Sequence, residues 1–338
     1  MTASCTHLLE ELQTTLERYK VLERRPTDLS GKLKKAWKRV AWEPEDIRDL
    51  RGRITSNITL LEALNGHIIR DNTFKLIQNY DDEERKAILN WLTAAEYATQ
   101  HSDFIERREP GTGEWFLESK EYRQWITCAE PTLFSPGIPG SGKTILASIV
   151  IDDVLHRYQQ DPDVGIAYIY LNFRQQEQQR LQNLLSSLLK QLLYKKPTLP
   201  ESIRELHDAH VAKGTRPSIS ELSAALSRVA ASYTSIYLVI DALDECRVAD
   251  GCRQEFINQL LSLQLQTGVT SQLFATSRSI PEIAEHFEDS LILRVRATDE
   301  DVSRYVDSSL ARLSRCVRDD KDLQAEIKRE IVKCVDGM

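Results

Sequence analysis

The stretch GIPGSGKT, residues 137–144, decides the fold of this 338-residue chain. It fits the P-loop pattern G-x-x-x-x-G-K-[ST] in full. A glycine-rich loop lets backbone N–H groups approach a phosphate, and the positive N-terminal end of the following helix adds to the attraction. Lys143 is expected to reach the β- and γ-phosphates, and the Thr144 hydroxyl to bind Mg²⁺. The predicted nucleotide-binding residues are Gly137, Ile138, Pro139, Gly140, Ser141, Gly142, Lys143 and Thr144.

The residues on either side support this interpretation, because a P-loop should follow a buried strand and open a helix. A short apolar run at 132–135 precedes the motif and predicts the strand. No glycine or proline interrupts residues 144–158, which predict the helix. Its apolar positions share one helical face: Ile145, Ile149, Val150, Val154 and Leu155.

A second acidic motif, SIYLVIDALDE at 235–245, supplies the expected magnesium partner. Its continuous apolar run suits a parallel strand that is buried on both faces. We assign Asp241, at the end of that strand, to Mg²⁺ through water. Glu245 is the first candidate for the carboxylate that polarises the attacking water, and Asp244 is the second. The alternative is that these acidic residues only cap a helix start.

A third motif, SQLFATSR at 271–278, predicts another buried strand that ends in Arg278. A guanidinium at a strand end can bind a γ-phosphate in a bidentate manner, so Arg278 is a candidate nucleotide-sensing residue. The alternative is a surface arginine that caps the strand end.

Strands predicted at 165–173 and 291–295 alternate with helices at 177–194, 201–213, 219–233 and 252–267. This alternation predicts an α/β fold of three αβα layers around a mainly parallel sheet. Ligands bind such sheets at the carboxyl ends of the strands, where all three motifs fall.

GIPGSGKT, YLVIDALDEC and LFATSR, in this order and spacing, resemble a NACHT-type P-loop NTPase of the STAND class. The resemblance is to fungal proteins with a nephrocystin-3-like N-terminal NTPase, and it covers about residues 45–338. It implies an ATP/ADP switch with Mg²⁺, weak nucleoside triphosphatase activity and self-association on activation. It further implies a cytoplasmic role in fungal non-self recognition or programmed cell death. Repeat arrays usually follow the NTPase in such proteins, so we expect this chain to be truncated after it.

The helical spacing of residues 1–112 predicts an α-helical N-terminal region, which can serve as a protein-binding arm or as a packing scaffold. The helix-breaking stretch RREPGTGEW at 107–115 predicts a linker. We therefore expect an NTPase domain at 113–297 and the start of a helical subdomain at 298–338.

Net charge, apolar content and cysteine spacing limit which partners and metals this chain is expected to bind. The formal net charge of −7 gives no general attraction to nucleic acid. No run of 18 apolar residues predicts a membrane span, and the polar N-terminus is not a signal peptide. Six scattered cysteines without a C-x-x-C pair argue against zinc and suit free thiols in a reduced, intracellular protein.

Three alternatives to an ATP switch place different demands on the sequence. A small-molecule kinase needs an acceptor-binding lid, often arginine-rich, and only Arg174 and Arg180 lie near the motifs in sequence. A GTPase needs a guanine-reading N/T-K-x-D element, which is missing after any predicted strand, although GTP binding stays possible. The third alternative is a nucleotide-binding scaffold without turnover.

Overall fold

The computed structural model describes residues 81–265, 268–310, 317 and 320–335, with isolated positions at 52, 56, 66, 69 and 73. The chain divides into two compact units, Met1–Glu83 and Glu84–Met338. Most of the predicted N-terminal helical region lies outside the described residues. That region and the domain boundaries at 112/113 and 297/298 stay predictions.

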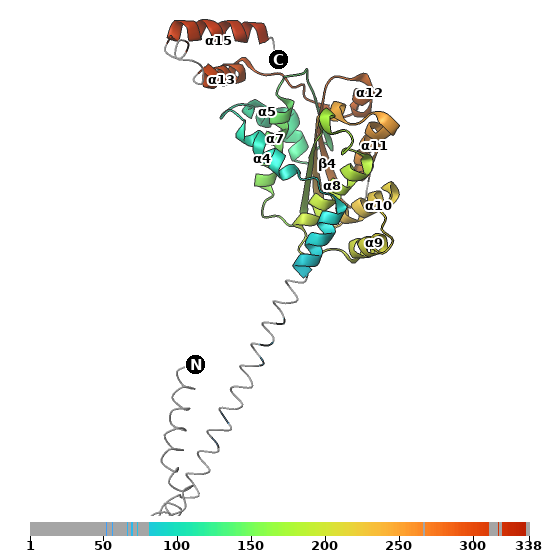
Figure 1. The fold of residues 1–338 in the computed structure, drawn as a ribbon. Helices are drawn as coiled ribbons and strands as arrows, with labels where there is room; N and C mark the ends of the chain where they lie inside the picture. The colour runs from blue at the N-terminus through green and yellow to red at the C-terminus, as the bar shows by residue number, and fades with distance from the viewer. Residues whose placement is uncertain are drawn as a thin grey trace, which may run out of the picture. The chain divides into compact units, whose positions relative to one another are not determined.

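The second unit is built around a parallel sheet (Figure 1). Its five strands lie in the order β2-β3-β4-β1-β5. The strands are β1 (Thr132–Pro136), β2 (Val164–Tyr170), β3 (Ser235–Asp241), β4 (Thr270–Ser277) and β5 (Leu291–Ile292). The two strands that carry the P-loop and the acidic motif, β1 and β3, are therefore not neighbours. Strand β4 lies between them and pairs with both.

Alternate residues of β1, β2, β3 and β4 face two separate hydrophobic cores, as expected for strands buried on both faces. Helices α5 (Glu114–Glu118), α6 (Lys120–Ile126) and α7 (Lys143–Arg157) contribute to one core. Helices α8 (Leu181–Lys195), α10 (Ile219–Ala230) and α11 (Cys252–Gln264) contribute to the other. Figure 1 shows the two groups on opposite sides of β4. The predicted three-layer αβα fold is confirmed.

The remaining helices belong to neither of the two groups named for the cores. A helix over 81–92 precedes α4 (Tyr97–Glu106), and α9 (Glu201–Val211) lies between α8 and α10 in the chain. A short α12 (Pro281–Ala284) follows β4. The C-terminal part contains α13 (Asp299–Leu310) and α15 (Lys321–Val335). None of the described helices combines the length and the apolar character needed to cross a membrane.

Several predicted boundaries were wrong by a few residues. Strand β2 ends at Tyr170, because the chain leaves the sheet for a 3₁₀ turn at Phe173–Gln175 that the Asn172 side chain caps. For the same reason α8 starts at Leu181 rather than at 177. Helices α9, α10 and α11 end two to three residues early, at Val211, Ala230 and Gln264.

At the edge of the sheet, β5 is regular only over Leu291–Ile292, shorter than the predicted strand at 291–295. Its neighbour β1 still accepts backbone hydrogen bonds from Leu293 (3.0 Å) and Val295 (2.8 Å). Residues 107–113 are not helical, which agrees with the break predicted there, but Glu114 and Trp115 already belong to α5. We call residues 107–113 the linker.

Candidate nucleotide-binding site

The P-loop connects β1 to the first turn of α7, as the sequence predicts. Gly142 has φ 85° and precedes the helix directly, a conformation that residues with a Cβ rarely adopt. Gly137 is required by space, because a Cβ there would lie 2.6 Å from Ser141 Oγ and 2.9 Å from the Val295 carbonyl oxygen. The buried Ser141 hydroxyl has no hydrogen-bond partner among the described residues. The loop therefore combines a tight glycine cradle with an unsatisfied polar group.

Lys143 folds back onto its own loop. Its Nζ donates to the carbonyl oxygens of Gly137 (2.9 Å) and Ile138 (2.8 Å). Burial lowers the pKa of Lys143, and the nearby carboxylates of Asp244 and Asp241 oppose that shift. A phosphate group would replace the two neutral carbonyls with a charged partner, which an ammonium in a partly buried loop binds more strongly.

Asp241 at the end of β3 is held by two threonines. Thr144 Oγ1 donates to Asp241 Oδ2 at 2.8 Å, and Thr276 Oγ1 donates to Asp241 Oδ1 at 2.6 Å. Burial raises the pKa of Asp241 from 3.8 to about 6, although both hydroxyl donors favour the carboxylate. The two sequence-predicted magnesium residues, Thr144 and Asp241, are therefore in direct contact.

The chain turns sharply after Asp241. Ala242 has φ 58° and ψ 52°, a left-handed conformation that costs a non-glycine residue on the order of 1 kcal/mol. Its N–H donates to Thr276 Oγ1 at 2.9 Å, which fixes the turn against β4. The turn leads into a 3₁₀ helix, Leu243–Glu245, that carries the two remaining acidic residues.

Asp244 and Glu245 have different partners. Asp244, whose side chain is 5 % exposed, accepts from the backbone N–H of Arg278 (3.0 Å) and pairs with Arg278 Nε through its other oxygen (3.0 Å). Glu245 Oε2 accepts from the backbone N–H of Phe173, just after β2, at 3.1 Å. Arg278 thus lies at the predicted strand end, where it is bound to Asp244.

The order of the strands explains this grouping. Since β4 lies between β1 and β3, the end of β4 supplies Thr276 and Arg278 directly between the P-loop and the acidic motif. Thr276 is not among the residues predicted for the site. The only local signal for it is a polar residue at the end of an apolar strand, and its role becomes visible only once the strand order is known.

These residues fit a magnesium ion. A hydroxyl and a carboxylate are hard oxygen ligands, and Mg²⁺ in phosphate sites takes one or two protein ligands and completes its shell with waters and phosphates. Thr144 would bind the ion directly, with its hydrogen still donated to Asp241. Among the described residues, no group of three or more His, Cys, Asp or Glu could hold a metal ion.

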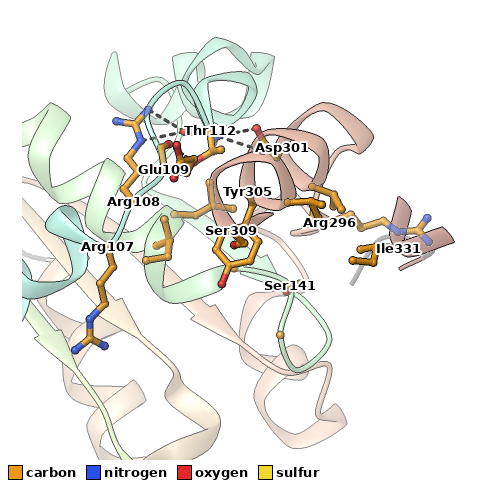
Figure 2. Close-up of a pocket in the computed structure, with 18 of the residues that line it drawn as sticks. Arg107, Arg108, Glu109, Thr112, Ser141, Arg296, Asp301, Tyr305, Ser309 and Ile331 are labelled. Atoms are coloured by element: carbon orange, nitrogen blue, oxygen red, sulfur yellow. Dashed lines mark hydrogen bonds between the residues drawn. The ribbon is translucent and has the colours of Figure 1, made fainter. Parts of the chain in front are cut away.

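A cavity of about 510 Å³ lies beside the P-loop residues Gly140, Ser141 and Gly142 (Figure 2). One wall comes from the linker before β1 and from α7, and the opposite wall comes from α13 and α15. Most of the lining is apolar, with aromatic rings from Trp115 and Tyr305. A mostly apolar cavity thus lies directly beside the phosphate loop, as is common for small-molecule binding sites.

Asp301 fastens α13 to the linker across this cavity. Both of its oxygens accept from the backbone N–H of Gly113 at 3.2 Å, and Oδ2 also accepts from Trp115 Nε1 at 3.0 Å. Arg304, one turn later, donates to the carbonyl oxygen of Gly111. We call these contacts the α13 latch; Figure 2 shows its Asp301 part. The sequence analysis missed it, because its partners lie nearly 190 residues apart.

Comparison with known proteins agrees with this geometry. A family model described as Nephrocystin 3, N-terminal, matches residues 111–278, from the linker to Arg278, just under half of the chain. The chain contains a P-loop NTPase domain. None of the curated proteins is significantly similar to this chain.

Several solved structures resemble the P-loop NTPase at low sequence identity. They include AMPPCP-bound DnaA from Aquifex aeolicus (13% identity, 69% of this chain and 60% of that chain, TM-score 0.38). The Walker-type ATPase PABY2304 of Pyrococcus abyssi has 11% identity, coverages of 69% and 67% and a TM-score of 0.44. The ORC1 protein of Aeropyrum pernix in complex with DNA has 17% identity, coverages of 57% and 48% and a TM-score of 0.37. The chain spans about 60% of the length of the DnaA structure.

The raised pKa of Asp241 predicts a pH dependence of stability without ligand. Because burial raises this pKa from 3.8 to about 6, the folded state binds the proton more tightly than the unfolded state. The stability that Asp241 contributes is complete below its unfolded pKa and is lost as the pH rises through about 6. Relative to Asp241→Asn, the free energy of unfolding should fall by on the order of 2 kcal/mol between pH 4 and 6.5. Urea titrations of both proteins measure this difference, and a flat difference curve would refute it.

Proposed function

We propose that this chain is the nucleotide-binding module of a STAND-class signalling switch that binds ATP and Mg²⁺ and hydrolyses ATP slowly. The observation that carries the proposal is the contact between Thr144 of the P-loop and Asp241 of the acidic motif at 2.8 Å. It supports a single magnesium–phosphate site at the carboxyl edge of the sheet, where Mg²⁺ would neutralise the phosphate charge.

The same contacts support slow rather than fast hydrolysis. A general base must be within hydrogen-bond reach of the attacking water. Glu245 is occupied by the Phe173 N–H, and Asp244 is paired with Arg278. Glu245 has the neutral and hence weaker of these two partners, which supports it as the residue that polarises water. Arg278 then senses the γ-phosphate only after it exchanges Asp244 for a phosphate oxygen.

The apolar cavity supports a nucleoside site next to the phosphate loop. Its volume of about 510 Å³ lies within the roughly 300–1,000 Å³ of small-molecule pockets. We assign the base and ribose of ATP to it, with GTP as the alternative nucleotide. Helix α13 forms one wall of the cavity, and the α13 latch binds this helix to the linker. A bound nucleoside would therefore contact both α13 and the linker. This arrangement supports a coupling between nucleotide state and the position of α13.

The remaining parts of the proposal come from the resemblance to fungal NACHT proteins. They are self-association on activation, an unknown protein partner at the N-terminal helical region, a cytoplasmic location and a role in non-self recognition or cell death. The proposed roles at the site belong to the same switch: Arg278 senses the γ-phosphate, and Glu245, or Asp244 as second candidate, polarises the attacking water. No binding to nucleic acid is proposed, since the net charge of −7 does not favour it.

The test compares ATP, ADP and GTP on one preparation of the chain. Affinity, turnover and oligomer size are measured for each nucleotide by calorimetry, phosphate release and light scattering. We expect ATP to bind more tightly than GTP, to turn over slowly and to increase oligomer size relative to ADP. Fast turnover that requires a small-molecule acceptor would replace the switch with a kinase. Binding without any turnover or assembly would favour a scaffold.

An Asp301→Ala variant extends this test, because the substitution does not change any residue of the phosphate site. It removes the acceptor for Gly113 N–H and Trp115 Nε1, so α13 should keep only the Arg304 part of the α13 latch and be held more weakly to the linker. If the latch couples α13 to the nucleotide, oligomer size in this variant should no longer differ between ADP and ATP. An unchanged difference would remove α13 from the coupling. Asp307→Ala, on the same helix but outside the latch, is the matched control.

A further inference from the structure

A buried pair of cysteines directly follows the acidic motif, and no step proposed above uses it. Cys246 comes immediately after Glu245, and Cys252 begins α11. Both are free thiols and both are buried, Cys246 completely. Cys128, the third free cysteine whose side chain the structure describes, is exposed.

The backbone between the two cysteines forms a closed turn. Asp250 and Gly251 adopt left-handed conformations, with φ 60° and 69°, which reverse the chain. The N–H of Arg253 then donates to the Arg247 carbonyl oxygen at 3.0 Å and closes the turn. As a result the thiols of Cys246 and Cys252 interact with each other across it. The Cys252 thiol also donates to the carbonyl oxygen of Gln179 at 3.6 Å.

The two sulfurs have unequal surroundings. The hydrogen bond from Cys246 lowers the pKa of the Cys252 thiol to about 7 against the effect of burial, with smaller help from the Leu181 backbone and from Arg247. The same hydrogen bond, together with burial, raises the pKa of Cys246. Cys252 is therefore the more acidic thiol of the pair, and Cys246 keeps its proton.

We propose that Cys246 and Cys252 are an oxidisable dithiol that a hydroperoxide converts to a disulfide next to the acidic motif. The Cys252 sulfur attacks one peroxide oxygen, the O–O bond breaks, and the leaving oxygen takes up a proton as water, or as an alcohol from an organic peroxide. Cys252 is then a sulfenic acid. The Cys246 sulfur attacks it, the S–S bond forms and the S–O bond breaks. The Cys246 proton leaves with that oxygen as water, so two thiols lose two electrons and the peroxide gains them.

The disulfide would act on the acidic motif through Arg253. This guanidinium donates to the carbonyl oxygens of Asp244 (2.7 Å) and Cys246 (3.2 Å), so it ties the start of α11 to the motif. A covalent bond between residues 246 and 252 shortens the thiol contact and displaces the segment that carries Glu245. We infer that oxidation lowers ATP turnover and reduction restores it. This consequence rests on the proposed function, whereas the dithiol itself does not.

The full chain offers a direct chemical test, because trypsin cuts at Arg247 between the two cysteines. The reduced chain is treated with hydrogen peroxide, its remaining thiols are alkylated, and it is digested. We expect peptides 229–247 and 248–253 to appear as one disulfide-linked species that dithiothreitol separates. Cys252→Ser should abolish the species, and Cys246→Ser should leave a sulfenic acid at Cys252 that dimedone traps. Cys128→Ser, which removes an exposed thiol elsewhere, should leave the species unchanged.

ATP turnover measured on the same samples separates two claims: that the disulfide forms, and that it acts on the acidic motif. Oxidation should reduce ATP turnover by up to about 10²-fold, the scale of a misplaced catalytic group, and dithiothreitol should restore it. If no linked peptides form in the wild type, the dithiol proposal is wrong whatever the activity. If they form and turnover is unchanged, the dithiol stands and its effect on the acidic motif is wrong. If the reduced chain has no turnover, the proposed function fails and the peptide result still decides the dithiol.

Discussion

Lys143→Ala is expected to weaken ATP binding by about 2–5 kcal/mol, or roughly 30-fold to several thousand-fold in Kd. The substitution removes the ammonium that now bridges the carbonyl oxygens of Gly137 and Ile138. Without it, phosphate charge in a partly buried loop loses its nearest cation. Isothermal titration calorimetry at fixed salt and magnesium concentration measures the change.

The control for this variant is Lys213→Ala, which removes an exposed lysine just after α9. It should bind ATP like the wild type, and both variants should unfold close to the wild-type temperature. If Lys143→Ala binds ATP with unchanged affinity while folded, GIPGSGKT does not hold the phosphates and the proposed site is wrong.

Glu245→Gln is expected to lower ATP turnover by roughly 10²–10⁴-fold while ATP affinity is retained. Glutamine keeps an oxygen that can accept the Phe173 N–H now bound by Glu245 Oε2, so the local fold should persist. It lacks the negative charge that polarises an attacking water. Phosphate release under saturating ATP measures turnover, and calorimetry on the same sample measures binding.

Asp244→Asn and Glu282→Gln complete this comparison. Asp244→Asn weakens the pair with Arg278 and makes the guanidinium more available to phosphate, so we expect a smaller loss of turnover without weaker ATP binding. Glu282→Gln changes an exposed carboxylate on α12 and should have no effect. A large loss of turnover in Asp244→Asn with none in Glu245→Gln would transfer the role of base to Asp244.

Local patterns were sufficient to predict most of the sheet. Runs such as Ile236–Ile240 are too continuous for a half-exposed strand and too short for a helix, so they indicate parallel strands buried on both faces. The P-loop was predictable because its chemistry is carried by consecutive residues. Boundaries were less certain where tertiary contacts decide them, as at Asn172, whose side chain caps the 3₁₀ turn after β2.

The partners within the site were not predictable in the same way. The charges of Asp244 and Arg278 are visible in the sequence, yet their mutual pairing is decided by the position of β4 beside β3. Thr276 is an ordinary polar residue until the sheet order brings it within 2.6 Å of Asp241. Asp301 reads as one of several acidic residues at the start of a helix, and only the fold brings it to Trp115.

The amino-acid sequence alone thus determined the phosphate loop, the acidic motif and the αβα architecture, because each depends on residues that are close together in the chain. The tertiary structure decided which carboxylate is paired with which donor, where the nucleoside-sized cavity lies and that two cysteines face each other across a turn. These features depend on strand order and on contacts between distant segments. Residue type and local spacing carry no information about such contacts until the chain has folded.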